Sequence, residues 1–308
     1  MDKRRIGSLE VSVVGLGCNN FGWRLDADGT KKVVDAALDA GINFFDTADI
    51  YGTGQSEEYL GRALGRRRSE VVLATKFGMK MDDQRKGAKP SYLRQALEDS
   101  LSRLGTDHVD LYQLHTPDSE VPIADTLGAL DELVKAGKVR EIGCSNFSAD
   151  QLREAEAAVG PGAARFVSVQ NEYSLFHREP EREVLAACEQ LGLAFIPFFP
   201  LASGILTGKY RKGRPRPEGT RIKPGSRFEK LLTEENLDRI EKLVAFAESR
   251  DHTLLDLAFA WLLAHPPVAS VIAGAMSPEQ VRTNAGAAGW RLSAEEIVEI
   301  DRIVPGLA

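Results

Sequence analysis

Residues 41–52 read GINFFDTADIYG, in which a short apolar run ends in polar, chemically active side chains. Two further apolar runs end in the same way, in VVLATK (71–76) and VDLYQLH (109–115). Such runs are typical of strands buried in a parallel sheet, and helix-patterned segments lie between them. Parallel strands point the same way, so their carboxyl ends meet at one rim of the sheet. In a (β/α)8 barrel that rim holds the active site.

The same alternation continues along the chain. Strand-like runs lie at residues 13–17, 42–45, 71–75, 109–114, 139–143, 166–170, 194–198 and 270–273. Helix-patterned stretches between them, such as 30–40, 92–104, 124–136, 149–158 and 181–190, indicate repeated β-α units. A hairpin is expected over residues 3–13, and helices at 233–249 and 293–303 fall outside the repeat. The predicted fold is an α/β protein, a (β/α)8 TIM barrel with an N-terminal hairpin and two extra helices, in a single domain over residues 1–308.

Composition limits the class of protein. The chain has 308 residues, 43% of them hydrophobic, which suits one barrel of about 250 residues with insertions. The net charge of −6 provides no basic field for nucleic acid or an anionic membrane. No apolar run approaches the ~20 residues of a membrane span, and the first residues lack a signal region. We therefore expect a cytoplasmic protein that binds neither nucleic acid nor membrane.

Three cysteines, Cys18, Cys144 and Cys188, are far apart and odd in number. This spacing supports neither a disulfide framework nor a metal-binding pair, so structural thiols are expected. No metal site is predicted.

Asp46, Tyr51, Lys76 and His115 stand at or just beyond three of the predicted strand ends. Carbonyl reduction at neutral pH needs an acid, and a free tyrosine with a pKa of ~10 is poorly matched to that task. A nearby Lys76 ammonium would favour the tyrosinate and make Tyr51 a stronger acid, while Asp46 would pair with Lys76. His115 would hydrogen-bond the substrate carbonyl, with a share in proton transfer at lower pH as an option.

Taken singly, each of these side chains has an ordinary structural explanation. The Asp could cap a turn, the Lys could be solvated, the Tyr could anchor a loop and the His could be a satisfied polar residue. Their joint occurrence at consecutive strand ends favours a catalytic interpretation. The set is suited to protonating an oxygen that is becoming an alkoxide, which indicates carbonyl reduction.

Over nearly its whole length the chain resembles the aldo-keto reductase superfamily. Residues 41–52 are similar to the first signature of that family, and LEDSLSRL (97–104) with DHVDLYQLHTPD (107–118) is similar to its second. By this resemblance the four residues above match the family's catalytic tetrad, with Tyr51 as general acid. The resemblance also implies a nicotinamide dinucleotide extended across the carboxyl rim of the barrel.

The cofactor residues are inferred from the same resemblance, because the chain lacks a GxGxxG turn in a dinucleotide-binding setting. Ser145, Asn146 and Gln170 match the positions that hold the carboxamide, with ordinary strand-end capping as the alternative. Phe198 takes the position that stacks on the nicotinamide, where Tyr or Trp is more usual, or is simply barrel core. The other implied contacts are Gly17, Cys18, Asp46, Pro200, Leu201, Ser203, Gly204, Lys209, Arg221, Gly274, Gln280 and Asn284.

Cofactor preference depends on two opposing signals. Thr283 replaces a commoner Glu and Met276 a frequent Ser, which weakens the expectation of NADP selectivity. Residues 209–227 form a basic stretch, expected to be a mobile loop, whose Lys209 and Arg221 favour a 2′-phosphate. The other basic residues of this loop, Arg211, Lys212, Arg214 and Arg216, are expected to form a solvated face. NADPH is therefore the predicted cofactor, with NADH as the alternative.

The substrate pocket is predicted from Asn19, Trp23, Tyr51 and His115. Three further side chains are either additional walls or packing: Phe77, Met79 and Phe176. These walls suit aldehydes, ketones or sugars without ranking them, and the sequence leaves the oligomeric state undetermined.

The predicted function is NADPH-dependent, reversible reduction of an aldehyde or ketone to an alcohol, with hydride from the nicotinamide and the proton from Tyr51. One alternative keeps the site as an NAD-dependent sugar or alcohol dehydrogenase. The other is a cofactor-binding redox sensor with little turnover, because potassium-channel β subunits share this fold.

Overall fold

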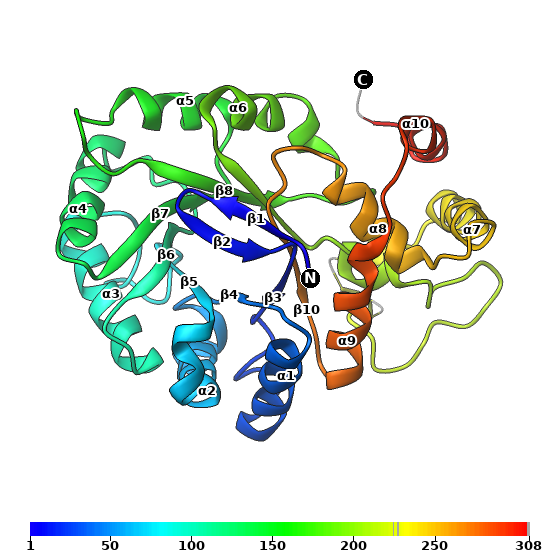
Figure 1. Ribbon diagram of the computed structural model, residues 1–308, viewed down its shortest axis with the longest axis horizontal. Coiled ribbons are helices and arrows are strands. Elements are labelled where there is room, and N and C mark those ends of the chain that lie inside the picture. Colours follow the sequence, from blue (N-terminus) through cyan, green and yellow to red (C-terminus); the bar gives the residue numbers. More distant parts are fainter. Residues whose placement is uncertain (224, 227, 307–308) are drawn as a thin grey trace.

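The computed structural model describes residues 1–223, 225–226 and 228–306. Within these residues, eight parallel strands form a barrel in the order β10-β3-β4-β5-β6-β7-β8-β9 (Figure 1). The strands are β3 (Val14–Gly17), β4 (Phe44–Asp46), β5 (Val72–Phe77), β6 (Val109–Leu114), β7 (Val139–Ser145), β8 (Phe166–Glu172), β9 (Ala194–Phe198) and β10 (Val271–Gly274). The predicted barrel is confirmed.

The barrel closes where its first and last strands in the spatial order approach each other. The backbone N–H of Phe195 in β9 donates to the carbonyl of Pro267 at 2.7 Å, and Ala269 donates to the carbonyl of Phe195 at 3.0 Å. These bonds lie just before β10, so they join β9 to the chain entering β10 and leave the sheet nearly closed.

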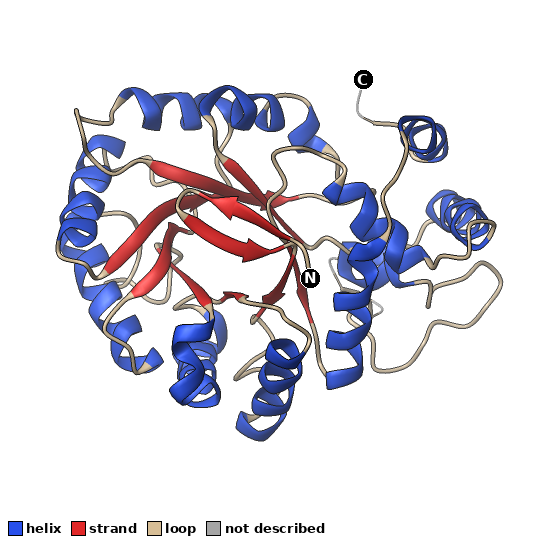
Figure 2. Cartoon of the chain, viewed as in Figure 1, coloured by secondary structure: helices blue, strands red, loops and turns tan. Residues whose placement is uncertain are grey.

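Eight helices follow the barrel strands and surround them (Figure 2). They are α1 (Ala27–Asp39), α2 (Gln55–Leu64), α3 (Pro90–Leu104), α4 (Ile123–Lys135), α5 (Ala149–Ala157), α6 (Val184–Leu191), α8 (Leu254–Leu263) and α9 (Pro278–Gly286). Local sequence sets several starts: Asp26 caps α1, and capping boxes begin α5 at Ser148 and α8 at Thr253. Every residue of α8 except Asp256 is buried, which explains its almost continuous apolar sequence.

Two helices lie outside this ring, as predicted. They are α7 (Glu234–Glu248) and α10 (Ala294–Ile303), which pack on each other beside α8. The Arg178 guanidinium ties α10 to the loop after β8 by donating to Asp301 at 2.8 Å and to the Val304 carbonyl at 2.6 Å. Arg178 also forms an ion pair with Glu181 at 2.7 Å.

The hairpin of β1 (Lys3–Ile6) and β2 (Leu9–Ser12) crosses the amino-terminal end of the barrel (Figure 1). Its turn requires a positive φ of 56° at Gly7, a conformation that glycine adopts without strain. The hairpin buries Ile6, Leu9 and Val11 against the barrel interior, in a cluster completed by Phe44, Val72, Ala74, Leu111, Ile196, Ala269 and Ile272. This packed layer fills one end of the barrel and leaves the carboxyl rim for chemistry.

Several strands extend beyond their predicted ends. β5 includes Lys76, β7 includes Ser145 and β8 reaches Glu172. Polar residues at these positions continue the backbone ladder, with Ser145 paired to Gln170 and Glu172 to Phe198. In these three strands the apolar run therefore marked the start of the strand and missed its polar carboxyl end.

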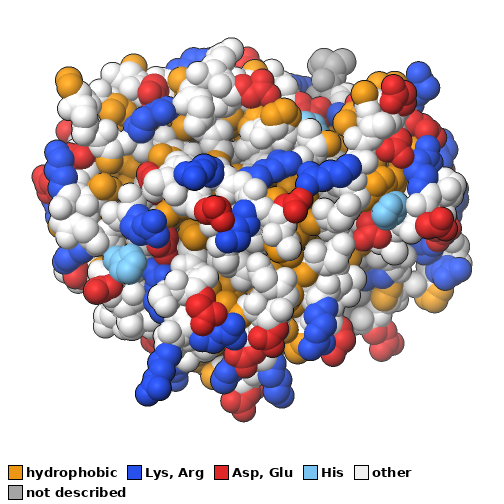
Figure 3. Space-filling model, in the orientation of Figure 1, with side chains coloured by type: hydrophobic (Ala, Val, Ile, Leu, Met, Phe, Trp, Pro, Cys, Tyr) orange, Lys and Arg blue, Asp and Glu red, His pale blue; other side chains and the backbone are white. Residues whose placement is uncertain are grey.

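The face shown in Figure 3 carries interspersed acidic and basic side chains. Among the residues that the structure describes, no helix is long and apolar enough to cross a membrane, and no cluster of His, Cys, Asp and Glu could hold a metal ion.

Candidate active site

Asp46 and Lys76 form a buried ion pair at the carboxyl ends of β4 and β5. The Lys76 Nζ donates to Asp46 Oδ2 at 2.5 Å and to the Thr47 carbonyl at 3.0 Å. Their side chains are 0% and 2% exposed. The pairing expected from the sequence is therefore present, and Lys76 is held from two sides.

Tyr51 lies above this pair in the turn η1 (Tyr51–Gly54). Its ring centroid is 5.2 Å from Lys76 Nζ and 5.8 Å from the ring of His115, which it meets edge-on at 82°. The turn depends on Gly52, whose φ is 57° and whose missing Cβ would lie 3.1 Å from the Phe21 carbonyl oxygen. A side chain at that position would be strained and crowded.

The second oxygen of Asp46 is held by two amides that come from strands across the barrel. Gln113 Nε2 donates to Asp46 Oδ1 at 3.1 Å, and Gln170 Nε2 donates to it at 2.9 Å. Gln113 was not predicted from the sequence, although it lies two residues before His115 on the same strand. The amides complete a hydrogen-bonded floor beneath Tyr51.

A cleft of about 1250 Å³ opens over this floor at the carboxyl rim. Asp46, Tyr51 and His115 line it, whereas Lys76 lies beneath the surface. From there the cleft runs past the ends of β7, β8 and β9 to the loop after β9 and to α9. The same cleft is therefore lined by residues as far apart in sequence as Gly17 and Asn284.

A family model described as the Aldo/keto reductase family matches residues 13–305. The chain belongs to the aldo/keto reductase family. It is 36% identical to the aldo-keto reductase yakc [NADP(+)] of Schizosaccharomyces pombe, over 96% of this chain and 89% of that protein. It is also 36% identical to a probable voltage-gated potassium channel subunit beta of Oryza sativa, over 90% and 87% of the two chains.

A solved structure of a glycerol dehydrogenase from Gluconobacter oxydans is similar, with a TM-score of 0.85, 31% identity, and coverage of 98% of this chain and 94% of that one. Family membership makes the protein an NAD(P)H-dependent oxidoreductase, and the family acts on small carbonyl compounds. The resemblance to the aldo-keto reductase superfamily inferred from the sequence is confirmed.

In this aldo/keto reductase, burial and charge oppose each other at Tyr51. Burial raises the pKa of the phenol, while the Lys76 ammonium pulls it down and Asp46 pushes it up again. The resulting pKa of Tyr51 lies above its ordinary value. The Lys76 charge acts in the expected direction and favours the tyrosinate, but the opposing effect of burial is larger. For Lys76 itself, burial lowers the pKa, but Asp46 and Tyr51 more than reverse this and keep the amine protonated.

His115 is neutral across the physiological range. Burial, and then the Lys76 charge, lower its pKa to about 3. Its Nδ1 is buried and has no hydrogen-bond partner among the described residues, so Nε2 is the nitrogen that can serve a ligand in the cleft. A share in proton transfer at moderately low pH, one of the expectations from the sequence, is not supported by this environment.

Every residue predicted to bind the cofactor lines the cleft. At the inner end, Asn146 donates its amide to the His115 carbonyl at 2.9 Å and to Ser145 Oγ at 3.1 Å. Ser145 Oγ donates in turn to the Gln170 carbonyl at 2.7 Å. This network fixes the side chains of Asn146 and Ser145 at the wall, and the amide of Gln170 is already used on Asp46. Cys18 is a buried thiol whose pKa is raised by burial, so it is a neutral wall residue.

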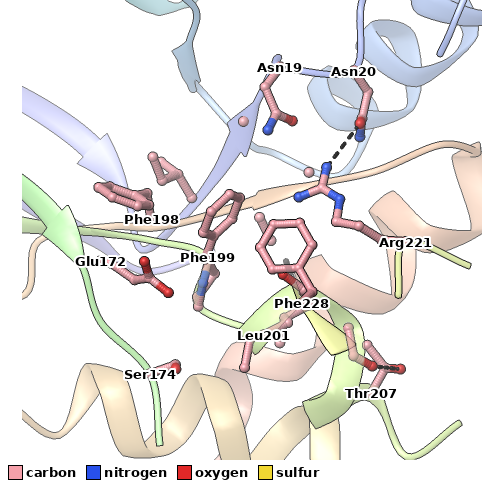
Figure 4. A pocket seen from close by; sticks show the side chains of 18 of the residues that line it. Asn19, Asn20, Glu172, Ser174, Phe198, Phe199, Leu201, Thr207, Arg221 and Phe228 are labelled. Atoms are coloured by element: carbon pink, nitrogen blue, oxygen red, sulfur yellow. Dashed lines mark hydrogen bonds between the residues drawn. The ribbon is translucent and has the colours of Figure 1, made fainter. Parts of the chain in front are cut away.

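The turn after β9 has a backbone suited to close contact with a ligand. Phe199, Ala202 and Ser203 have positive φ values, as does Gly204 at 96°. A Cβ at Gly204 would lie 2.9 Å from the Lys209 Nζ. Figure 4 shows Phe198 and Phe199 projecting from this turn toward the cleft. An extended nicotinamide dinucleotide fits these residues, with a flat ring at the inner end and cations at the outer end.

The outer end gathers positive charge. Arg221 donates to Asn20 Oδ1 at 3.2 Å and stacks over the Phe199 ring at 5.5 Å (Figure 4). Burial lowers the pKa of Lys209, and the charges of Arg221 and Arg24 lower it further. Cations gathered this closely around Lys209 attract a multiply charged phosphate group. Asn20 and Arg24 were not predicted, because no motif marks them.

The rest of the basic loop is attached to α7. Arg211 pairs with Glu241 at 2.6 Å and Lys212 with Asp238 at 2.5 Å. Arg216 forms an ion pair with Glu229 at 2.7 Å. Lys212, Arg214 and Arg216 are exposed, in line with the solvated face expected for this loop, whereas Arg211 is half-buried against Glu241. Residues 224 and 227 of the predicted loop lie outside the described residues.

The predicted substrate wall is correct in position for Asn19, Tyr51 and His115, which line the cleft. Trp23 does not line it: this residue is 69% exposed and lies in the loop before α1. Its neighbours Asn20 and Arg24 both line the cleft, so proximity in sequence to Asn19 did not decide the position of this side chain. Met79 and Phe176 line the cleft, whereas Phe77 is buried and stacks on Tyr112 at 4.7 Å.

Several wall residues were missed by sequence reasoning. The end of β8 contributes Glu172, the loop after it contributes Ser174 and His177, and the loop before α7 contributes Phe228. Glu172 continues the ladder from Gln170, so a longer prediction for β8 would have found it. Phe228 meets Phe199 edge-on with ring centroids 5.7 Å apart, a contact between distant segments that no local pattern marks.

Proposed function

We propose that this protein reduces an aldehyde or ketone to an alcohol with NADPH, and that Tyr51 supplies the proton. The observation that carries the proposal is the Tyr51 ring 5.2 Å from a lysine that a buried carboxylate keeps charged. This arrangement lies at the floor of a cleft lined by the predicted cofactor residues. The opposite direction, alcohol oxidation, uses the same groups in reverse.

When bound, the cofactor supplies a hydride to the carbonyl carbon. Tyr51 then transfers its phenolic proton to the carbonyl oxygen, which gains electron density as the new bond forms. The Lys76 ammonium stabilises the tyrosinate that remains, and Asp46 keeps that ammonium in place. The neutral His115 donates a hydrogen bond to the carbonyl and orients it. Because the pair beneath is shielded from water, its field acts at greater strength than it would at the surface.

NADPH is the proposed cofactor because Arg24, Lys209 and Arg221 meet at the outer end of the cleft. Guanidinium and ammonium groups bind a 2′-phosphate that NADH lacks. The similar reductase from Schizosaccharomyces pombe carries NADP(+) in its name. We propose a small carbonyl compound with polar substituents as the substrate, because Asn19, Glu172 and Ser174 line the cleft.

An NAD-dependent alcohol or sugar dehydrogenase is the second candidate. Thr283 and Met276 line the adenosine end of the cleft in place of the carboxylate and hydroxyl commoner in the family. The similar solved structure is that of a glycerol dehydrogenase, which favours alcohol oxidation as the alternative direction. A redox-sensing role is suggested by the likeness to the potassium channel subunit, and would require tight cofactor binding with little turnover.

The test is a comparison of the wild type with Tyr51→Phe, which removes the proton donor and keeps the ring. We expect NADPH-dependent turnover over a panel of small aldehydes to fall roughly 10²-fold or more, with NADPH affinity largely retained. Unchanged turnover would remove Tyr51 from the acid role. A higher kcat/KM with NADH than with NADPH would favour the dehydrogenase, and binding without turnover in the wild type would favour the sensor.

A further inference from the structure

Asp49, the second carboxylate of the DTADIYG stretch, lies behind the tetrad and takes no part in the chemistry above. It is 1% exposed, and neither of its carboxyl oxygens has a hydrogen-bond partner of good geometry among the described residues, although the Tyr92 phenol faces it. Its backbone N–H donates to the carbonyl of Lys76 at 3.1 Å. Asp49 thus belongs to the short segment that connects the ion pair at Lys76 to the phenol of Tyr51.

A second buried carboxylate accompanies it. Glu57, at the start of α2, is 0% exposed and accepts hydrogen bonds from Thr75 Oγ1 at 2.5 Å and from Arg103 Nε at 2.7 Å. Thr75 is the residue before Lys76 on β5, so Glu57 braces the same strand that carries the lysine. Arg103 is already engaged with Glu57 and with Ser100 Oγ at 3.2 Å.

The groups facing Asp49 come from every element packed around it. They are Glu57 on α2, Tyr92 and Arg103 on α3, and Tyr112 on β6. The cluster therefore holds two carboxyl groups, one guanidinium and two phenols, and its single cation is hydrogen-bonded to the other carboxylate. An ionised Asp49 would be a second buried negative charge without a cation of its own, which is costly in such surroundings.

We propose that Asp49 is a positioning residue that holds the Tyr51 turn against β5 only while its carboxyl group is protonated. The neutral carboxyl fits the buried space between α2, α3 and β5. Ionisation draws it toward the half-buried Tyr92 and solvent, because the Arg103 guanidinium of the cluster is already paired with Glu57. That movement pulls on the segment whose N–H is bonded to the Lys76 carbonyl, and so shifts the Tyr51 phenol relative to Lys76.

The electrostatic environment agrees with this role. Burial, and next the charge of Glu57, raise the pKa of Asp49 to about 7, well above its ordinary value. The carboxyl group is therefore protonated below neutral pH and ionised at alkaline pH. The Arg103 guanidinium acts in the opposite direction but with a smaller effect.

The effect on turnover rests on the proposed reductase function, so the experiment has one readout with turnover and one without. The first is kcat/KM for NADPH-dependent aldehyde reduction from pH 6 to pH 8.5. The second is amide hydrogen exchange of residues 47–54 in the cofactor-free protein, corrected for the intrinsic pH dependence of exchange. Wild type, Asp49→Asn and Asp83→Asn are compared. Asn mimics the neutral carboxyl, and Asp83 is a matched control whose side chain is 91% exposed.

In the wild type and in Asp83→Asn we expect kcat/KM to fall up to about tenfold between pH 6 and pH 8, since only about one-tenth of the groups stay neutral one pH unit above a pKa of about 7. Exchange of residues 47–54 should rise over the same range. Asp49→Asn should lose both dependences, so that its kcat/KM at pH 8 stays within about twofold of its own value at pH 6.

Two outcomes overturn the proposal: parallel pH profiles of kcat/KM in wild type and Asp49→Asn, or exchange of residues 47–54 that is indifferent to pH in the wild type. A third outcome separates it from the proposed function. If no carbonyl is reduced at any pH, but exchange changes with pH in the wild type and not in Asp49→Asn, the reductase assignment fails and the positioning role of Asp49 stands.

If Asp49→Asn does not fold, Tyr92→Phe replaces it. Removing the phenol that faces the carboxyl takes away a group that lowers the pKa of Asp49, so both transitions should move to higher pH. Transitions that stay in place would overturn the proposal.

Discussion

Replacing Asp49 by Asn should change how the stability of the protein depends on pH. In the unfolded chain an aspartate has a pKa of 3.8, and in the folded protein burial raises that of Asp49 to about 7. The folded state therefore binds a proton that the unfolded state releases over this range. The stabilising contribution of the protonated carboxyl is fully present below about pH 4 and is lost as the pH rises through 7. Asn does not titrate, so the variant escapes this loss.

The size of the effect follows from the two pKa values. A separation of about three pH units, at 1.36 kcal/mol per unit, corresponds to about 4 kcal/mol in total. Between pH 5 and pH 8 about 3 kcal/mol of this should be lost by the wild type alone. That is a large share of the 5–15 kcal/mol typical of a folded protein.

Urea unfolding of the cofactor-free proteins, followed by fluorescence at pH 5, 6, 7 and 8, measures this difference. Any fixed cost of burying an amide at position 49 is the same at every pH, and the other titrating groups are shared by both proteins. The informative quantity is therefore the change with pH of the difference in unfolding free energy. A difference that stays constant from pH 5 to pH 8 would show that Asp49 is ionised in the folded protein and would refute the reasoning.

Three other perturbations test the remaining contacts. Lys76→Met should lower the unfolding free energy by about 3–5 kcal/mol because it leaves the Asp46 carboxylate buried without its cation. Adding Asp46→Asn should recover part of that loss, whereas additive losses in urea unfolding would contradict a coupled pair. Arg221→Ala should raise the Kd for NADPH at least tenfold and leave the Kd for NADH within about threefold, because a hydrogen bond to a charged group typically contributes about 1.5–3 kcal/mol. Fluorescence titration with both nucleotides measures the two Kd values. Arg178→Met should lower the unfolding free energy by about 3 kcal/mol by leaving Glu181 and Asp301 without their shared cation, whereas an unchanged urea midpoint would mean that α10 is held by apolar packing alone.

The barrel could be predicted because its strands are buried on both faces. A strand of this kind is a nearly continuous apolar run, as in residues 109–114, and the helices between such runs have a different period. The tetrad was found for a related reason, since polar residues at the ends of apolar runs have few structural uses that recur at three consecutive strands. Both signals are local in sequence.

The errors concern properties that depend on distant contacts. Trp23 lies close in sequence to Asn19, but it is 69% exposed and does not line the cleft. Gln113 and Asn20 are ordinary amides in sequence, and only the fold brings them to Asp46 and Arg221. The effect of the Lys76 charge on Tyr51 was predicted from the motif, whereas the burial that raises the pKa of Tyr51 was not, because the extent of burial depends on the fold.

The hairpin at the amino-terminal end of the barrel affects the order of events in catalysis. Its side chains and the interior layer fill that end, so any ligand of the described cleft enters and leaves by the carboxyl rim. A ligand seated deep against Asp46 and Phe198 lies beneath whatever occupies the outer part of the same opening. We therefore expect ordered binding, in which the molecule at the bottom of the cleft is the first to bind and the last to dissociate.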